Sequence, residues 1–346
     1  MPSPSVSAPT AGRMSDIDRA KGLAILLVVF GHLVARQDPA GVGWYEPLRI
    51  LVYLFHMPFF MYLSGYVAFR SGAARTPLEA WPLLARRRAE RLLLPFLLFG
   101  LMILGGKLIA ARLVPVDNLP PDFWRGVRAL LWDTGASPAT SVWYLGVLFV
   151  YSLATPLLVR SGSFLWVIAL ALFALPAPPV LYADRICAYF VFFVAGGMAA
   201  DAGPRWLHAI DRWRWLAAAC FAALLAAVAA GCFPVDFSAG TRSGGYKALM
   251  LAASLLAIPA IHGLVRAAPL VGSRVLLWLG GASFAIYLLN TVCIGLAKGL
   301  LLRVVSWDGA NFLPFAAALM VAGTLGPVLI RALVLRRARL LERLTA

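Results

Sequence analysis

Charged residues are scarce in this sequence, and acidic residues are the scarcest. Only 13% of its 346 residues are charged, with 15 Asp and Glu against 31 Lys and Arg. Hydrophobic residues make up 62% of the chain, and the mean hydropathy is +0.83. Because a soluble globular domain carries about twice that share of charge, the composition excludes such a domain and indicates an integral membrane protein.

Residues that bind metals or form disulfides are also few. The four cysteines are scattered through apolar segments, without the spacing of a zinc site or of paired thiols. We expect them to be buried in helix packing. The four histidines form no ligand cluster with nearby carboxylates, so no metal site is predicted.

The start of the chain lacks the apolar core of a cleavable secretory signal. Residues 1–15 are rich in Pro, Ser and Ala, and we interpret them as a disordered cytoplasmic tail. We expect residues 16–335 to form a single transmembrane domain and residues 336–346 to form a basic cytoplasmic tail.

The net charge of +16 could indicate a nucleic-acid partner. The basic residues lie between apolar stretches rather than in one basic domain, so we predict no nucleic-acid binding and assign the excess to membrane topology. About ten stretches are long or nearly long enough to cross a hydrocarbon core. The predicted fold is an all-α polytopic bundle of about ten transmembrane helices, at residues 21–36, 48–70, 92–112, 143–159, 163–180, 184–200, 214–232, 247–265, 275–298 and 312–334.

The distribution of Lys and Arg predicts the orientation of this bundle. With a cytoplasmic N-terminus, the inner segments carry about twice as many Lys and Arg residues as the outer ones. An even number of spans places both termini on the same side. We therefore expect both ends of the chain in the cytoplasm.

Two ionisable residues in the first span are the most informative feature of the chain. Lys21 and His32 are separated by three helical turns, so they share one helix face about 16 Å apart along the axis. An ionisable residue at membrane depth is costly and is therefore a candidate functional residue. His56 lies at a similar depth in the next, antiparallel span, and we expect the two histidines to share a cavity.

Several motifs, in this order along most of the chain, resemble those of a known family. Two are specific: a basic residue, ten intervening residues and a histidine at Lys21–His32, and the aromatic-rich run Phe55–Tyr66. Weaker matches are Arg88-Ala-Glu-Arg91, Trp143-Tyr-Leu-Gly and Ser283–Asn290. The sequence resembles membrane acyltransferase family 3, bacterial inner-membrane O-acetyltransferases of surface glycans. The His-Met-Pro opening of the second motif is similar to the fucose-acetylase-like branch.

The resemblance implies transfer of an acyl group, most often acetyl, from acyl-CoA to a hydroxyl of a glycan or another acceptor. His32 would act as general base, because an alcohol is a poor nucleophile until its proton is being removed. Lys21, Arg88 and Arg91 would bind a phosphate of acyl-CoA. An interhelical hydrogen bond for His32 and a snorkelling cation for Lys21 remain as structural alternatives.

The other candidates stay open between function and structure. His56 could assist the reaction or satisfy backbone that a nearby proline leaves unpaired. Ser64 is assigned to donor binding, with local hydrogen bonding as the alternative. Trp143 and Tyr144 could stack on a sugar ring or belong to an interfacial belt. Asn290 is assigned to the acceptor site, although family members often have histidine there.

The predicted function is thus a membrane O-acyltransferase of the bacterial inner membrane, and its expected partners are acyl-CoA, a hydroxyl acceptor and the bilayer. The runner-up is a secondary transporter or flippase for a polar substrate. Transporters often contain two related halves, and the motifs around His32 and His56 have no counterparts later in the chain. The sequence leaves the acyl group, the acceptor and the oligomeric state open.

Overall fold

The computed structural model describes residues 14–34, 41–112, 116, 118–337 and 342, and the described part of the chain is helical without strands. The predicted tails at residues 1–15 and 336–346 fall almost entirely outside it. The α-helices are α1 (Ser15–Gly31), α2 (Tyr45–Tyr53), α3 (His56–Arg70), α4 (Trp81–Arg88), α5 (Leu94–Ala110), α6 (Phe123–Leu131), α7 (Trp143–Leu158), α8 (Phe164–Ala174), α9 (Ala183–Ala202), α10 (Pro204–Ala229), α11 (Gly244–Leu264), α12 (Arg274–Leu301) and α13 (Phe312–Leu333).

The all-α membrane bundle predicted from the sequence is confirmed. Eight helical stretches among the described residues are long and apolar enough to cross a membrane. The first and fifth predicted spans correspond to the shorter helices α1, with 17 residues, and α8, with 11. The predicted end of the fifth span at residue 180 was wrong: Leu175 is already extended, because a residue that precedes a proline is disfavoured in the helical conformation.

The first span was also displaced in the sequence-based prediction. It was expected at residues 21–36, whereas α1 begins at Ser15 and ends at Gly31. His32 is therefore the residue that caps the C-terminal end of the helix and does not lie inside it. The N-terminal shift brings Asp16 and Asp18 into the first turn, where negative charge favours the positive end of the helix dipole.

The second span, predicted as one helix over 48–70, is broken between α2 and α3. Pro58 lacks an N–H and its ring crowds the carbonyl four residues earlier, which belongs to Leu54. The Ser254 hydroxyl of α11 donates to this Leu54 carbonyl at 3.3 Å. The break therefore follows from the proline, and α11 supplies a replacement donor for the freed carbonyl.

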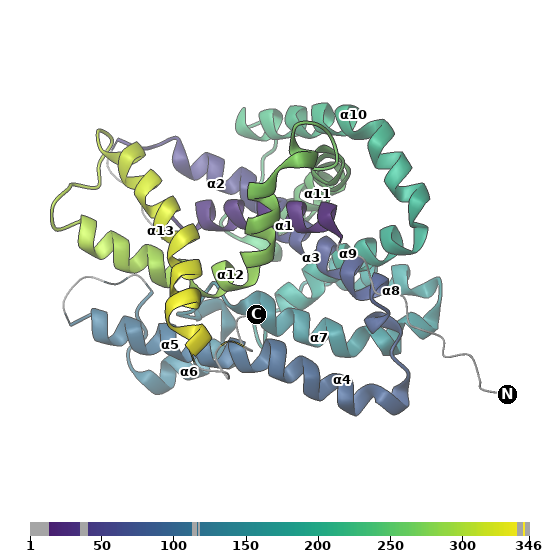
Figure 1. Cartoon of the computed structure of the whole chain (residues 1–346), viewed down its shortest axis with the longest axis horizontal. Helices are drawn as coiled ribbons and strands as arrows, with labels where there is room; N and C mark the ends of the chain where they lie inside the picture. Colours follow the sequence, from purple (N-terminus) through teal and green to yellow (C-terminus); the bar gives the residue numbers. More distant parts are fainter. Residues whose placement is uncertain (1–13, 35–40, 113–115, 117, 338–341, 343–346) are drawn as a thin grey trace.

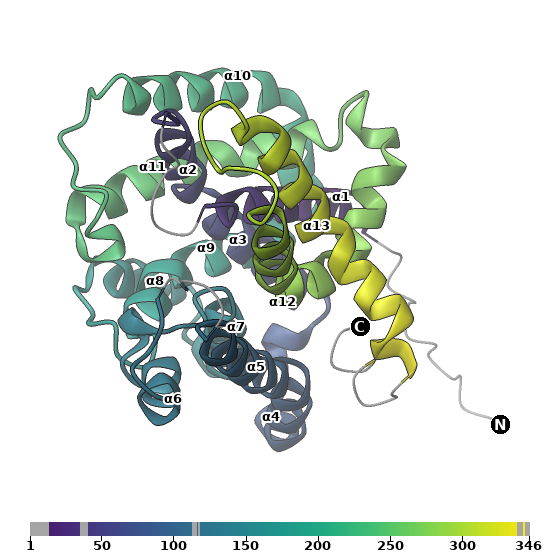
Figure 2. The ribbon, with the colours of Figure 1, turned by 90° about the vertical axis from the view of Figure 1, so that its left-hand side faces the viewer.

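The helices surround a core in which α3 and α9 are central and α10 is peripheral. In the stretch that contains α3, 67% of the best span window is buried, and the same fraction holds for α9, against 6% for α10. Figures 1 and 2 show α10 along one edge of the bundle and α4 along the opposite edge, with α1 and α3 between them. Residues near the start of α1 therefore reach several neighbouring helices.

Glycines allow two pairs of central helices to touch backbone to backbone. Where α1 crosses α12, a Cβ on Gly22 would lie 2.1 Å from the Leu276 carbonyl oxygen, and one on Gly280 would lie 1.8 Å from that of Asp18. Small residues at such crossings are the usual means of close helix association in membranes.

Glycines also bring the backbones of α3 and α9 into direct contact. A Cβ on Gly65 would lie 1.9 Å from the Phe193 carbonyl oxygen, and one on Gly196 would lie 2.0 Å from that of Tyr62. The two crossings fix the helices that carry the sequence-predicted site residues Lys21, His32, His56 and Ser64.

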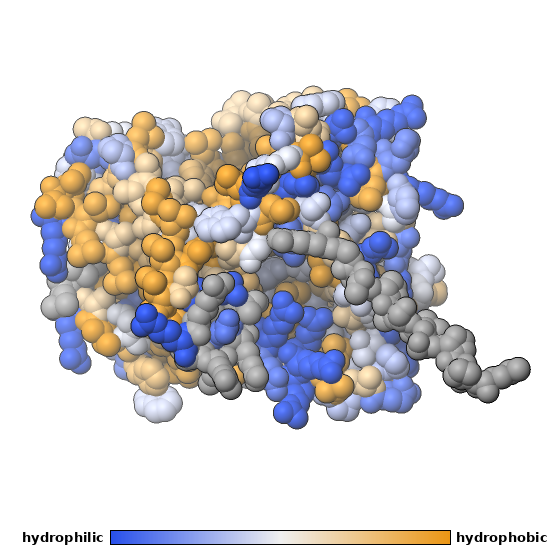
Figure 3. All heavy atoms as spheres, viewed as in Figure 1, coloured by the Kyte–Doolittle hydropathy of each residue, from blue (hydrophilic) through white to orange (hydrophobic). Residues whose placement is uncertain are grey.

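The surface matches a protein that lies in a bilayer. In Figure 3, hydrophobic side chains cover much of the left-hand part of the face, over α12 and α13, and hydrophilic ones gather on the right, towards the N-terminus. Large exposed hydrophobic residues on α13 include Leu313, Val321 and Leu329. Such continuous apolar surface requires an apolar solvent or partner.

Three residues depart from their expected surroundings. Of the cysteines, Cys187 and Cys293 are buried as expected, but Cys220 and Cys232 are exposed, because α10 and its C-terminal loop lie at the periphery. Lys247, counted as an outer flanking residue, is buried, and its Nζ donates to the Phe173 and Leu175 carbonyls at 2.7 and 3.2 Å. It therefore caps the C-terminal end of α8, where a cation is favourable.

Candidate functional site

The C-terminal end of α1 is held by two tyrosines, and this places His32. The Tyr45 hydroxyl donates to the Phe30 carbonyl at 2.5 Å, and the Tyr53 hydroxyl donates to the Gly31 carbonyl at 2.8 Å. Both carbonyls belong to the last turn, where no intrahelical partner exists. A Cβ on Gly31 would meet the Tyr53 ring at 2.6 Å, so the absence of a side chain permits this contact.

His56 lies beside His32, as the sequence predicted, at the first residue of α3. The two imidazoles are close enough to interact electrostatically. The His56 Nδ1 contacts the Val52 carbonyl at 2.8 Å, and since a carbonyl only accepts, Nδ1 carries the proton. His56 thus satisfies backbone at the helix break, and its Nε2 remains as a proton acceptor. The contact of Nδ1 with Val52 is structural, and Nε2 is the nitrogen that can take part in a reaction.

Around these histidines, α2 supplies a cation and an aromatic ring. Arg49 forms a two-point ion pair with Glu46, with both contacts at 2.6 Å, and its charge acts on His32. The Tyr53 ring lies 4.9 Å from the His56 ring, between centroids. The site therefore combines two imidazoles with one arginine that is already paired. Arg49 was not among the site residues predicted from the sequence.

In the N-terminal half of α1, Lys21 belongs to a basic cluster. Its Nζ lies 3.7 Å from the Asp18 carboxylate, and the Arg91 charge acts on Lys21 and also on Arg88. The structure thus brings together the three cations expected to bind the donor. Residues Ala89–Leu93 form a π-helical turn within the long helix, and such turns are frequent at functional sites.

Ser64 and Tyr144 also come together, and Tyr287 of α12 adjoins them. The Ser64 hydroxyl donates to the Phe60 carbonyl at 2.9 Å and contacts the Tyr144 hydroxyl at 2.5 Å. The Tyr144 backbone N–H contacts the Tyr287 hydroxyl at 3.3 Å. These contacts place α3, α7 and α12 around one polar seam, and the predicted local hydrogen bond of Ser64 is present.

Asn290 lies on the same helix as Tyr287 and is completely buried. Its amide Nδ2 donates to the Ile286 and Tyr287 carbonyls at 2.8 and 2.9 Å. Its Oδ1 has no hydrogen-bond partner among the described residues. An orphaned acceptor at such a depth is unfavourable unless a ligand or water satisfies it.

Trp143 is buried among side chains of α9 and is not part of an exposed interfacial belt. Its ring lies 5.1 Å from the Tyr189 ring, and the Arg185 guanidinium lies 4.8 Å from its centroid. Only 9% of Trp143 is exposed, which leaves little of its ring available to a ligand. The structure thus places Trp143 under Arg185, and the contact with a sugar ring expected from the sequence stays a prediction.

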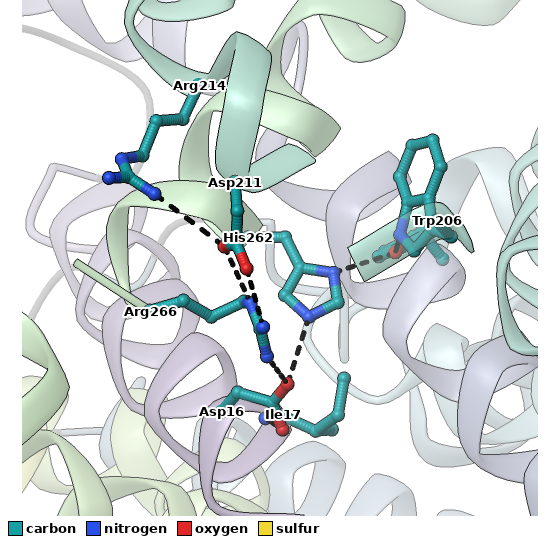
Figure 4. A network of polar contacts seen from close by, with 8 residues as sticks. Asp16, Ile17, Trp206, Asp211, Arg214, His262 and Arg266 are labelled. Carbon is teal, nitrogen blue, oxygen red and sulfur yellow. Dashed lines mark hydrogen bonds and ion pairs between the residues drawn. The ribbon is translucent and has the colours of Figure 1, made fainter. Parts of the chain in front are cut away.

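The most extensive polar network was not found from the sequence. Figure 4 shows Asp16 of α1 facing His262 and Arg266, and Arg266 facing Asp211. Arg266 donates to Asp16 at 2.9 Å and forms two bonds with Asp211, at 2.9 and 2.8 Å. The partners are up to 250 positions apart in the chain, so no local motif signals them.

The hydrogen-bond partners of His262 and Tyr62 show which of their atoms carry protons. The Trp206 Nε1–H donates to the Tyr62 hydroxyl at 2.8 Å, and that hydroxyl lies 2.8 Å from the His262 Nδ1. The His262 Nε2 faces the Asp16 carboxylate at 3.5 Å. Because the carboxylate only accepts, Nε2 carries the proton and Tyr62 donates to Nδ1.

The charges at the rim of this network stabilise one another. Burial raises the pKa of Asp16, but the contacts with His262, Ile17 and Arg266 outweigh it, and the pKa lies below the usual aspartate value. The hydrogen bond with Asp211 raises the pKa of Arg266. The network therefore stays charged at neutral pH and ties α1 to α10 and α11.

Two cavities of similar size accompany these clusters. One, of about 390 Å³, lies between α12 and α13 and is lined by residues that include Trp278, Ala285 and Arg331. The other, of about 400 Å³, lies beside α9 and includes Arg185 and Tyr189. His32 and Lys21 line neither of them. In the described residues, no group of His, Cys, Asp and Glu could hold a metal ion.

Comparison with known proteins assigns this helical bundle to a family. A family model described as an acyltransferase domain matches residues 14–332. The chain belongs to membrane acyltransferase family 3. The match covers both specific sequence motifs and all thirteen α-helices except the last residue of α13.

This chain is similar to two nodulation proteins. Nodulation protein NolL of Mesorhizobium japonicum is 29% identical over 234 residues, which are 66% of this chain and 58% of that protein. Nodulation protein NolL of Sinorhizobium fredii is 31% identical over 159 residues, 44% of this chain and 38% of that protein. The matched region thus spans less than two thirds of either relative. No solved structure matches the chain.

Proposed function

We propose that this membrane acyltransferase moves an acyl group, in the first instance acetyl, from acyl-CoA to a hydroxyl of a glycan or a related acceptor. The observation that carries the proposal is the arrangement of α1. A basic cluster includes Lys21 in the N-terminal half of α1, and a pair of imidazoles lies at its C-terminal end. The distance of about 16 Å along this helix suits a donor whose phosphates and thioester are far apart.

The basic cluster is the donor site in this proposal. Lys21, Arg88 and Arg91 bind phosphate groups of CoA, and the arginines suit two-point contacts with phosphate oxygens. The pantetheine arm then extends along α1 towards His32. With both termini in the cytoplasm of a bacterium, this cluster faces the compartment that contains CoA.

The histidine pair is the site of chemistry. One His32 ring nitrogen takes the proton of the acceptor hydroxyl while the hydroxyl oxygen attacks the thioester carbonyl. The carbon–sulfur bond then breaks, and the proton passes from His32 to the departing thiolate, which leaves as CoA thiol. The His56 Nε2 and the Arg49 charge are placed beside this reaction, and Tyr53 holds both histidines in register.

Substitution of the two ends of α1 tests the proposal. We expect His32→Ala to retain acetyl-CoA binding and to lose turnover by a factor of about 100 to 10,000. Lys21→Gln is expected to weaken acetyl-CoA binding at least tenfold. The measurement uses detergent-purified protein, radiolabelled acetyl-CoA and an envelope glycan extract as acceptor, and follows bound donor and labelled glycan.

His208→Ala is the matched control, because His208 is an exposed histidine of α10. It is expected to behave as the unsubstituted protein. Equal turnover in the His32→Ala and unsubstituted proteins would remove His32 from the reaction. If no protein binds acetyl-CoA but reconstituted protein transports a polar solute into liposomes, the transporter hypothesis replaces the enzyme.

A further inference from the structure

The cavity of about 400 Å³ beside α9 has the size of a small-ligand site. Its walls come from three separate parts of the chain: the first two turns of α9, the segment that leads into α11, and the loops at Gly135 and Pro179. The side chains that decide its chemistry are Asp184, Arg185, Tyr189, Arg242 and Tyr246. Charged and aromatic residues from α9 and from the start of α11 thus line the same cavity.

Two polar atoms in this wall lack partners. The Asp184 Oδ1 and the Arg185 Nη1 are buried and have no hydrogen bond with any described residue. The other carboxylate oxygen, Asp184 Oδ2, lies 3.5 Å from the Thr241 hydroxyl. Buried polar groups without partners are costly, and a ligand hydroxyl, which is both a donor and an acceptor, can satisfy either of these two.

The rest of the wall complements the carbon skeleton of such a ligand. Tyr189 and Tyr246 provide aromatic surface, and Trp143 supports Arg185 and Tyr189 from behind. The wall contains the Asp184 carboxylate as well as the two arginines Arg185 and Arg242, so a densely anionic ligand would meet a negative charge there. This combination of apolar rings with paired hydrogen-bonding groups favours a polyhydroxylated ring.

The cavity lies at the end of the bundle that carries His32. On α11, Tyr246 and His262 are 16 positions, or about 24 Å, apart, so the cavity and the Asp16 network lie at opposite ends of this helix. Tyr189 and Tyr246 both interact electrostatically with Tyr53. Tyr53 in turn binds the Gly31 carbonyl and packs on His56.

We propose that this cavity binds a sugar ring of the acceptor, with Asp184 and Arg185 as the groups that recognise adjacent hydroxyls. The inference rests on the proposed function, because it identifies the place from which the acceptor reaches His32. It assigns acceptor specificity to the start of α9 and the α11 entry, far from the basic cluster that binds the donor.

The test separates acceptor binding from donor binding. Purified protein is titrated with maltotriose, chitotriose and a glucuronate disaccharide, followed by intrinsic tryptophan fluorescence, and acyl transfer to each sugar is measured with radiolabelled acetyl-CoA. We expect saturable binding of at least one sugar. Asp184→Asn and Arg185→Gln are expected to raise its Kd and acceptor KM at least tenfold while the acetyl-CoA Kd changes less than twofold.

Asp308→Asn, at a half-buried loop aspartate outside the cavity, is the control and is expected to leave all constants unchanged. His32→Ala should bind the sugar normally and fail to transfer, so failure of the catalytic proposal is distinguishable from failure of the cavity proposal. Unchanged sugar Kd and KM in both cavity variants would overturn the inference, as would the absence of sugar binding and sugar-dependent transfer in unsubstituted protein. Equal binding of inorganic phosphate would identify an anion site instead.

Discussion

At the scale of single residues, the sequence reveals some functional candidates of α1 and not others. Lys21 and His32 are recognisable because both belong to one helix and one motif, and their spacing defines their geometry. Asp16 is not recognisable in this way, since its partners His262 and Arg266 come from α11 and its neighbourhood. Local periodicity contains no information about which distant polar side chains will meet.

Asp16 leads to a prediction about stability and pH. Because its pKa is lower in the folded protein than the usual value, its ionised form stabilises the fold at neutral pH, and this stabilisation is lost as the pH falls below about 4. Asp16→Asn should therefore reduce the free energy of unfolding by about 2 kcal/mol at pH 7, with a smaller deficit at pH 3.5. Thermal unfolding in detergent at both pH values measures this.

Asp133→Asn provides the comparison, because Asp133 pairs with Arg128 at an exposed position, where ion pairs contribute at most about 1 kcal/mol. A deficit of Asp16→Asn that is equal at pH 7 and pH 3.5 would contradict the ionised role of Asp16.

At the scale of helices, the sequence predicts most spans but places some ends wrongly. The apolar stretches correspond to α3, α5, α7 and α9 to α13, since hydrophobic length alone indicates them. The break before α3 was not predicted, because the apolar stretch continues through it. Pro58 is its local cause, and the Ser254 hydroxyl of α11 satisfies the freed carbonyl only after folding. Similarly, Lys247 was assigned to a flank, because its carbonyl partners at the end of α8 become apparent only after folding.

The glycine crossing of α3 and α9 gives a prediction at this scale. Gly196→Ala would place a methyl group 2.0 Å from the Tyr62 carbonyl oxygen, so the helices must separate. We expect a loss of about 1 to 3 kcal/mol in the free energy of unfolding, together with lower turnover because α3 carries His56 and Ser64. Thermal unfolding and the acetyl-transfer assay measure the two effects.

Gly105→Ala is the matched substitution, because Gly105 lies inside α5 with no atom within 4 Å of the added Cβ. It should be neutral or stabilising by up to about 1 kcal/mol, as expected from helix propensity. If both variants lose the same stability, close packing at the crossing is not the reason for Gly196.

At the scale of the whole molecule, family membership and the helical bundle agree with the expectation from composition and motifs. The arrangement of the candidate residues was predicted in part. The pairing of His32 with His56 follows from two consecutive antiparallel spans, and the grouping of Lys21 with Arg88 and Arg91 follows from their shared side of the bundle. The burial of Trp143 beneath Arg185 was not predicted, because it depends on how α7 meets α9.

The orientation in the membrane gives the prediction at this scale. Ser71 follows α3 and Ser306 follows α12, at exposed positions. In a chain without Cys220 and Cys232, a membrane-impermeant maleimide should label Ser306→Cys in intact cells and Ser71→Cys only after permeabilisation. This result is expected if both termini are cytoplasmic. The opposite pattern would reverse the side proposed for donor binding.

The crossing of α1 and α12 also gives α1 the properties of a lever. Contact at Gly22 and Gly280 is backbone to backbone, so it acts as a pivot close to the Asp16 network, and the distance from Gly22 to His32 is an arm of about 15 Å. A tilt of about 5° would displace His32 by about 1 Å, a shift that can reduce catalysis about a hundredfold. The hydroxyls of Tyr45 and Tyr53 are the stops that keep the far end of this lever in place.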